Sequence, residues 1–248
     1  MDNDVPVLDR VRKLLAKAED PSCPPAEAEA LTAKAAELIA KYGIDRAMLA
    51  ASSDEADVLG DRVIVVDPPY ALDKTQLLGG VAEALRCRAV RRTHYAPPEF
   101  RKQLMVHLFG FGSDLERTEL LYTSLLIQSA NALASRPVPP WQQPAAFRRS
   151  WLAGFTSAVV ARLREAERRA ERQAERDPGA GSSVALVLAD RTALVDRRMA
   201  EEYPRVRNAP PRRLSGSGFR DGQDAGRRAD LGGTRVGRRS AAAIPRRR

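Results

Sequence analysis

The stretch that best indicates the fold is residues 5–45, VPVLDRVRKLLAKAEDPSCPPAEAEALTAKAAELIAKYGID. Its first part carries apolar residues three and four positions apart, the pattern of an amphipathic helix with one buried face. A proline-rich elbow at residues 20–25 interrupts this helix, because proline lacks a backbone donor and disfavours helical geometry in the residue before it. A second helix then runs to Gly43, which suits a left-handed cap. We therefore predict an antiparallel hairpin of two helices as a domain at residues 5–50.

Three features of this stretch resemble a bacterial and phage domain-of-unknown-function family, numbered 2786. They are VRKLLAKAE at residues 11–19, the elbow, and AKYGID at residues 40–45. The region from about residue 61 to 240 more loosely resembles the longer segment that follows this hairpin in phage-type members. The resemblance implies a shape but no mechanism, because the matching residues are structural positions.

Residues 61–204 mix strand and helix patterns, which predicts an α+β domain. The run RVIVVD at residues 62–67 is typical of a strand covered on both faces. Further strands are expected at residues 87–92, 102–110 and 184–188, so the predicted sheet is small, with about four strands. Several helices pack on it. The longest begins near residue 145 and carries a row of expected core residues, Phe147, Trp151, Phe155, Val159 and Leu163.

The positive charge of the chain is concentrated after Pro204. Residues 205–248 hold 13 arginines against 3 aspartates, a net charge of +10, whereas residues 1–204 hold 28 basic against 29 acidic residues, a net charge of −1. Glycines at positions 218, 222 and 226 would share one face of a helix. Interior glycines cost a helix roughly 1 kcal/mol each, however, so a loop with at most a docked turn is preferred here. We predict a basic, largely disordered tail.

A charged, flexible segment can follow the phosphates of DNA or RNA, so the tail is the predicted partner-binding region. The competing interpretation is that the arginines only reflect an arginine-rich composition of a disordered end and bind no partner. The candidate nucleic-acid contacts are Arg212, Arg213, Arg227, Arg228, Arg235, Arg238, Arg239, Arg246, Arg247 and Arg248.

Other features limit the class of protein. Two cysteines, Cys23 and Cys87, make a disulfide framework unexpected and favour packed thiols in a cytoplasmic protein. The acidic N-terminus and the absence of an 18-residue apolar run argue against a signal peptide and against a membrane partner.

His107 lies in an apolar strand, which favours a hydrogen-bonded core histidine over a metal ligand. Trp141, in a proline-rich loop, is expected to dock on the body.

The sequence FGFGSDLERTEL at residues 109–120 is the nearest approach to a ligand motif. A glycine turn before a helix can hold phosphate, and Ser113 with Glu116 forms the pattern of a capping box. The third glycine of a dinucleotide site and the lysine of a P-loop are missing, however, and Asp114 and Glu116 would repel an anion. We assign no catalytic, cofactor-binding or metal-binding residue.

Three functions remain as hypotheses. The leading one is a non-enzymatic accessory protein of phage or mobile-element type that binds nucleic acid through its tail without sequence preference. The alternative is a protein-interaction module, in which the hairpin presents Arg10, Arg12, Lys13 and Lys17 to an acidic partner. The third is an enzyme of unrecognised type, built around residues 110–116 or around Asp67 and Asp73 near the end of the first strand.

Overall fold

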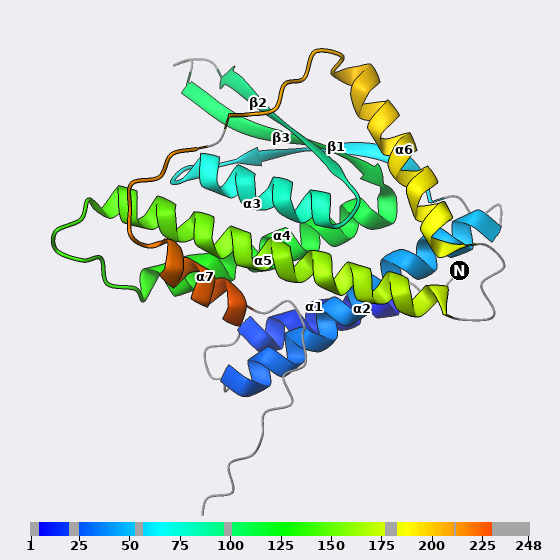
Figure 1. Cartoon of the computed structure of the whole chain (residues 1–248), viewed down its shortest axis with the longest axis horizontal. Helices are drawn as coiled ribbons and strands as arrows, with labels where there is room; N and C mark the ends of the chain where they lie inside the picture. The colour runs from blue at the N-terminus through cyan, green and yellow to red at the C-terminus, as the bar shows by residue number, and fades with distance from the viewer. Residues whose placement is uncertain are drawn as a thin grey trace, which may run out of the picture.

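The computed structural model describes residues 5–19, 25–52, 57–96, 101–176, 183–210 and 212–229 of the 248-residue chain. Helices surround a small sheet, with the longest helix crossing the whole body (Figure 1). The elements in chain order are α1 (Val5–Glu19), α2 (Pro25–Ser52), β1 (Leu59–Val66), α3 (Ala71–Ala84), β2 (Arg88–Ala96), β3 (Arg101–Phe111), α4 (Gly112–Ala134), α5 (Pro144–Glu175), α6 (Val184–Glu202) and α7 (Phe219–Arg228).

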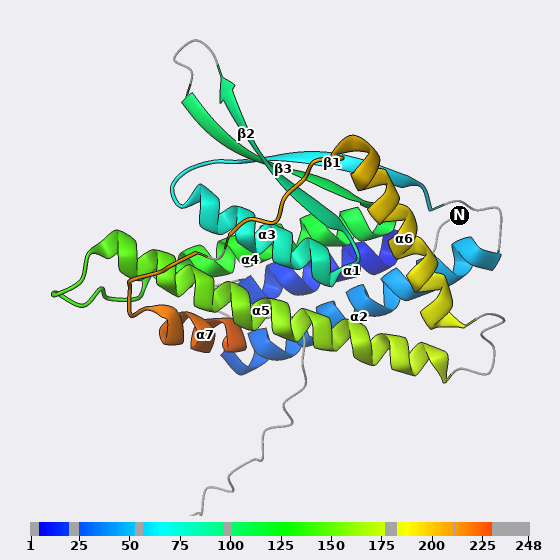
Figure 2. The same cartoon turned by 45° about the horizontal axis from the view of Figure 1, so that its top comes forward.

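The sheet has three antiparallel strands in the order β1-β3-β2, so β3 is central and both neighbours are edge strands. One face packs on α3 and α4 through the core that includes Val66, Leu78, Val106 and Leu108. The opposite face is covered at one end by α6, where Val195 packs against residues of β2 and β3. This places the main core between the sheet and the long helix α5, with α3 lying between them (Figure 2).

Two predictions about strands are wrong. Residues 184–188 form the start of α6 rather than a fourth strand, because Val184, Leu188 and Val195 are buried at helical spacing. The hydroxyl of Ser183 accepts a hydrogen bond from the Leu186 amide and caps that helix. β1 is not covered on both faces either. Val63 is 44% exposed because α6 covers only the other end of the sheet.

The sequence predicts that the second helix ends at Gly43, but α2 continues to Ser52. Its last two turns are held by a second apolar cluster, in which Ile44 and Ala47 pack against Val184 and Leu188 of α6. Tertiary packing therefore extends the helix past a residue that would otherwise stop it. At the other end, α1 packs against α2, and its Val11 and Leu15 join the main core.

The long helix α5 carries the predicted row of core residues, and all five are buried. Gly222 and Gly226, expected in a loop, instead lie on the helix α7, which packs against α5, and Gly218 is the N-cap residue of that helix. A Cβ atom at Gly222 would overlap the carbonyl oxygen of Trp151, and one at Gly154 would overlap that of Phe219. The two backbones approach this closely only because glycines face each other. Packing between the helices thus offsets the low helix propensity of glycine.

The described part of the predicted 205–248 tail is consequently not a loose appendage. The side chain of Arg162 on α5 donates hydrogen bonds to the carbonyls of Gly226 and Ala229 at the end of α7. Residues 230–248 lie outside the described part of the chain. No helix within the described ranges is long and apolar enough to cross a membrane.

We predict that Gly222→Ala detaches α7 from α5. The added methyl group has no room beside the Trp151 carbonyl, and overpacking of this kind costs about 1–3 kcal/mol. Hydrogen exchange of the α7 amides should show a loss of protection. Gly60→Ala is the control, because no atom lies within 4 Å of the Cβ that it adds. Equal protection of α7 in the Gly222→Ala variant and the wild type would contradict the packing described here.

Candidate functional site

The structure describes four of the ten arginines predicted to contact nucleic acid. Arg213 and Arg228 are exposed, and Arg227 is exposed but pairs with Asp224 one turn earlier. Arg212 is different, because its Nη1 lies 2.6 Å from the buried carboxylate of Asp73 and 2.7 Å from the side-chain oxygen of Gln76. The remaining six, Arg235, Arg238, Arg239, Arg246, Arg247 and Arg248, lie outside the described residues.

The ion pair of Arg212 joins the segment after α6 to the first turn of α3. Asp73 is 4% exposed, so the pair is largely shielded from solvent. Asp73 is one of the two carboxylates near the end of β1 that the sequence offers as active-site candidates. It serves instead as an anchor for Arg212, while Asp67 is exposed.

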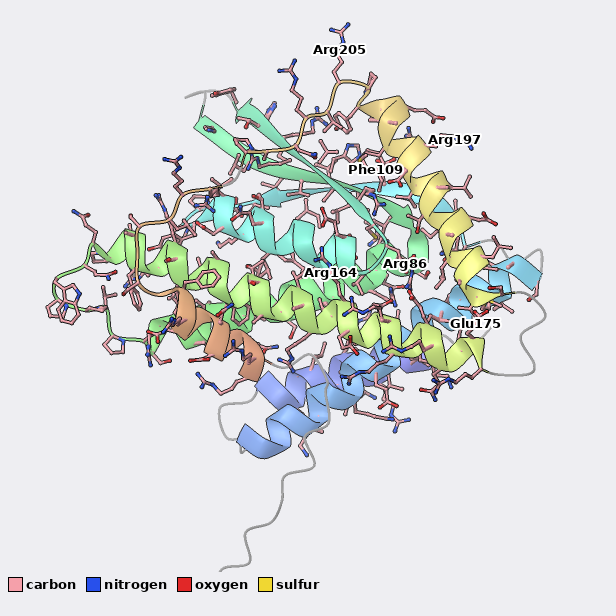
Figure 3. All side chains as sticks on the ribbon, in the orientation of Figure 1. Arg86, Phe109, Arg164, Glu175, Arg197 and Arg205 are labelled. Atoms are coloured by element: carbon pink, nitrogen blue, oxygen red, sulfur yellow. The ribbon has the colours of Figure 1, made fainter. Side chains whose placement is uncertain are left out.

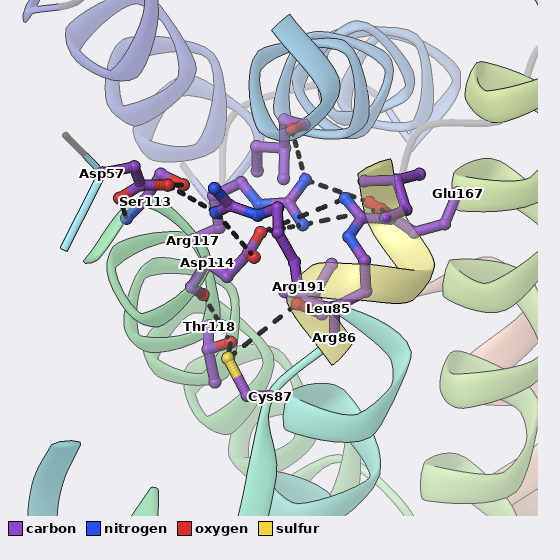
Figure 4. Close-up of polar contacts among 12 residues, drawn as sticks. Asp57, Leu85, Arg86, Cys87, Ser113, Asp114, Arg117, Thr118, Glu167 and Arg191 are labelled. Carbon is purple, nitrogen blue, oxygen red and sulfur yellow. Dashed lines mark hydrogen bonds and ion pairs between the residues drawn. The ribbon is translucent and has the colours of Figure 1, made fainter. Parts of the chain in front are cut away.

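A buried ionic network lies at the junction of four helices (Figure 4). At its centre is Arg117 on α4, whose side chain has no exposed surface. Its Nη2 lies 3.0 Å from Asp114, and its Nη1 lies 3.2 Å from Glu167 on α5 and donates to the Ile39 carbonyl of α2 at 2.8 Å. A single guanidinium therefore connects α2, α4 and α5.

The glycine of the AKYGID run explains how this arginine reaches α2. A Cβ atom at Gly43 would overlap the guanidinium of Arg117, so only glycine leaves space for it. The sequence suggested that Gly43 ends a helix. Its role is different: the absence of a side chain at Gly43 lets the buried guanidinium of Arg117 lie against the surface of α2. The backbone carbonyl one turn earlier, at Ile39, then becomes an acceptor for that charge.

Two further arginines extend the network. Arg86, in the turn after α3, places Nη1 2.8 Å from Glu167 and 3.2 Å from Glu171. Arg191 of α6 stacks over the ring of Phe111 and places Nη2 2.5 Å from Asp57 and 3.6 Å from Asp114. Glu167 is only 5% exposed, because Arg86 and Arg117 surround its carboxylate.

Asp57 occupies the N-terminus of α4, the position of the candidate phosphate site. It accepts hydrogen bonds from the Ser113 amide at 3.0 Å and the Ser113 hydroxyl at 2.6 Å. The predicted capping box is therefore wrong, since the Ser113 side chain does not cap the helix and the Asp57 carboxylate, from the segment between α2 and β1, takes that place. The backbone of the glycine turn, the helix dipole of α4 and the Arg191 guanidinium together stabilise the Asp57 carboxylate.

The network has balanced charge and favours a structural role over catalysis. Asp57, Asp114 and Glu167 face three arginines, and each carboxylate already contacts at least one of them. An open pocket of about 480 Å³ lies beside the network, but two of the charged residues that line it, Arg86 and Glu171, form an ion pair with each other. Within the described ranges, no group of three or more histidines, cysteines or acids is arranged to hold a metal ion.

His107 is a hydrogen-bonded core histidine, as predicted. Its Nδ1 lies 2.7 Å from the hydroxyl of Tyr203, and its Nε2 lies 2.8 Å from the carboxylate of Asp61. The residue is 5% exposed, and its ring packs at a tilt against the ring of Phe109 under the end of α6. The histidine therefore fastens the residue after α6 to the sheet. Sequence spacing gave no signal for either partner, because both are far from position 107 in the chain.

Two smaller predictions have different outcomes. Cys87 is a packed thiol, as expected, and its burial raises its pKa to about 12. Cys23 lies outside the described residues. Trp141 does not dock on the body: it is 82% exposed, because the loop between α4 and α5 extends away from the core.

The basic residues of α1 are only partly available to an outside partner. Arg12 pairs with Asp9 at 2.7 Å and with Glu116 of α4 at 3.5 Å. Arg10 and Lys13 are exposed. The protein-partner hypothesis for the hairpin therefore stays a prediction.

Comparison with known proteins bears on the N-terminal segment. Residues 7–46 match the family model described as Protein of unknown function (DUF2786), which confirms the resemblance expected from this stretch. The match covers most of α1 and most of α2, including Gly43 and Ile39, which meet Arg117. No curated protein and no solved structure matches the chain.

We predict that Asp57 contributes stability at neutral pH that disappears in acid. Burial alone would raise its pKa, but the hydrogen bonds from Ser113 and Arg191 outweigh burial and hold the pKa below its ordinary value of 3.8. A carboxylate with a lowered folded-state pKa stabilises the fold above its unfolded-state pKa, and this stability disappears as the pH falls through the folded-state value. Urea unfolding should show Asp57→Asn less stable than wild type at pH 7, with the gap narrowing below about pH 4. A gap independent of pH would contradict this assignment.

Proposed function

We propose that the protein is a non-enzymatic, cytoplasmic accessory protein of phage or mobile-element type that binds DNA or RNA through its C-terminal arginines, without sequence preference. The observation that carries this proposal is the partition of charge. The net charge is +10 after Pro204 and −1 before it. A nearly neutral body with one strongly basic segment suits a partner that is itself a dense row of negative charges.

The placement of α7 supports this proposal. Its close packing on α5 and the Arg162 hydrogen bonds hold the chain on the body up to Ala229. The arginines before Ala229 differ in environment. Arg212 anchors the segment to α3, while Arg213 and Arg228 are exposed. Beyond Ala229, residues 230–248 carry six arginines and one aspartate. The anchored part would present the rest of the segment to phosphates.

Binding of this kind would be driven by release of counterions from the nucleic acid. Each phosphate neutralised by an arginine steepens the fall of log K with log salt concentration by about 0.9 on duplex DNA. Interactions with phosphates carry no base information, so two oligonucleotides of unrelated sequence should bind equally well. Salt dependence is therefore the most informative property to measure.

Truncation at Pro204 is an unsuitable test of this proposal. That deletion would remove α7 and expose the face of α5 that carries Trp151 and Phe155. Substitution within the full chain avoids this difficulty. The tail variant replaces with glutamine the arginines at positions 235, 238, 239, 246, 247 and 248. The control makes the same change at six exposed arginines of α5, Arg148, Arg149, Arg164, Arg168, Arg169 and Arg172.

We predict that the tail variant binds a labelled duplex more weakly than wild type in fluorescence anisotropy. Its salt slope should be shallower by about 0.9 for each phosphate that the substituted arginines no longer neutralise. The α5 control should keep most of the affinity, although its net charge is the same. Equal binding by the tail variant and wild type, or equal weakening in both variants, would refute the proposal. The function would then be sought in a protein partner for residues 5–50, tested by co-purification with and without that segment.

A further inference from the structure

The loop between α4 and α5, residues 135–143, carries the most exposed large apolar side chain of the described structure. Trp141 is 82% exposed. Tryptophan is usually buried over most of its surface, so an almost bare indole ring is unusual. The loop projects from one end of the body beside the start of α7 (Figures 1 and 2). The ring is therefore accessible to a partner.

The backbone that carries Trp141 is fixed to the body although its ring is bare. The amide of Gln142 closes a turn by donating to the carbonyl three residues earlier, at 3.0 Å. The side-chain oxygen of Gln142 accepts a hydrogen bond from the Ser217 amide at 3.1 Å, and Arg136 pairs with Asp221 of α7 at 2.7 Å. A ring presented on a fixed backbone lowers the conformational entropy that binding must overcome.

This end of the body also has few acidic side chains. Residues 120–164, which comprise most of α4, the loop and more than half of α5, contain five arginines and no aspartate or glutamate. Arg136 and Arg162 bind groups of α7, and Arg164, which Figure 3 shows on α5, pairs with α3. Arg148 and Arg149, in the second turn of α5, are exposed and form no ion pair within the described ranges. Two uncompensated cations thus follow the bare ring.

The start of α7 adds a second ring and a third cation. Phe219 is the first residue of α7 and is 39% exposed. Arg220 follows it and is exposed, without an ion pair to any other described residue. The hydrogen bond between Ser217 and Gln142 holds this end of α7 beside the loop. We call these residues the ring–arginine surface: Trp141, Arg148, Arg149, Phe219 and Arg220.

Exposed rings together with unpaired guanidinium groups fit unpaired nucleotides. Every base presents a flat π face that stacks on an aromatic side chain, and phosphates bind arginine. A duplex keeps its bases stacked inside, so it offers phosphates but no free base to Trp141. A lipid surface would require a broad apolar face, whereas here two rings lie among three exposed arginines. The chemistry of this surface therefore favours single-stranded nucleic acid.

We infer that the ring–arginine surface binds single-stranded DNA or RNA, with Trp141 stacking on an unpaired base and Arg148 and Arg149 contacting nearby phosphates. This inference rests on the proposed function, and it adds a folded binding surface and a preference for unpaired strands. The helix α7 has 10 residues and is about 15 Å long, so one strand can reach both this surface and the start of the tail. The tail would add phosphate contacts to single and double strands alike.

The test uses Trp141→Ala in the full chain, which removes the ring without changing the charge. The ring is bare, so this substitution leaves the core intact. Trp141→Phe keeps an aromatic face, and Tyr95→Ala is the matched control, because it removes a ring that is 57% exposed from another element, β2. Anisotropy is measured with a DNA single strand, an abasic strand of the same length and a duplex, each over a range of salt.

We predict that Trp141→Ala binds the single strand about 5- to 100-fold more weakly than wild type, the effect of losing one stacked base. Its salt slope should not change, because a stacking ring releases no counterions. Trp141→Phe should bind more tightly than Trp141→Ala, and Tyr95→Ala should bind like wild type. On the abasic strand and the duplex, Trp141→Ala should match wild type.

A second variant, Arg148→Gln with Arg149→Gln, tests the phosphate contacts of the same surface. On the single strand, its salt slope should be shallower by about 0.7 for each substituted arginine, or about 1.4 in total. On the duplex, it should bind close to wild type, because no free base anchors the duplex at this surface. An unchanged slope on the single strand would remove both arginines from the interface.

Equal binding of the single strand by Trp141→Ala and wild type would overturn the inference. A loss of equal size on the single strand, the abasic strand and the duplex would overturn it too, because stacking on a base would not be the cause. Anionic lipid vesicles provide a further control. Vesicle binding by wild type that Trp141→Ala abolishes, with single-strand binding unchanged, would assign the ring to a membrane instead.

The tail variant described above separates this inference from the proposed function. Weaker binding by the tail variant, with full single-strand affinity in Trp141→Ala, would leave the proposed function standing and overturn the inference. Weaker binding by Trp141→Ala alone would keep the ring–arginine surface and reject the tail as the binding region. Full affinity in both variants would overturn both.

Discussion

The buried guanidinium of Arg117 is the constraint on which the arrangement of helices depends. A charge without exposed surface is tolerated only when its partners are close and well oriented, and here they come from α2, α4 and α5. Shifting α5 would separate Glu167 from Arg117 and Arg86, and shifting α2 would take the Ile39 carbonyl away from the buried guanidinium. Gly43 is part of the same constraint, because it provides the space through which the guanidinium reaches α2. The ionic network thus specifies how the segment that matches the family model meets the rest of the body.

This balanced interior contrasts with the basic elements at the periphery. Inside, arginines are matched by carboxylates, and Asp57 even takes the anion position at the start of α4. Five basic side chains at the periphery are exposed without a charged partner in the described structure: Arg91 and Arg92 on β2, Lys102 on β3, and Arg213 and Arg228 around α7. A rigid, nearly neutral body that carries basic extensions is the arrangement we propose for holding a polyanion.

The sequence predicted those features that depend on local periodicity. The α+β class, the buried row on α5, the packed Cys87 and the core role of His107 all followed from residue patterns along one element. The number of strands was wrong because a five-residue apolar run fits a strand and a helix equally well. The remaining errors involve partners distant in sequence. Backbone propensity alone predicted a helix end at Gly43 and a loop at Gly222, but packing of the end of α2 against α6 and of α7 against α5 decides their structure. No spacing rule could pair Arg191 with Asp57, or Arg212 with Asp73.

The central claim, that the Arg117 network holds the helices together, is tested most directly by a double-mutant cycle of Arg117→Met and Glu167→Met in urea unfolding. Each single substitution should cost about 3–5 kcal/mol, because it breaks a buried ion pair and leaves Glu167 with Arg86, or Arg117 with Asp114, as the remaining close charged partner. The destabilisation of the double variant should be clearly smaller than the sum of the two single effects. A parallel cycle on the exposed pair Arg169 and Glu165 should show little coupling. Effects of Arg117→Met and Glu167→Met that add to within about 0.5 kcal/mol would contradict the account.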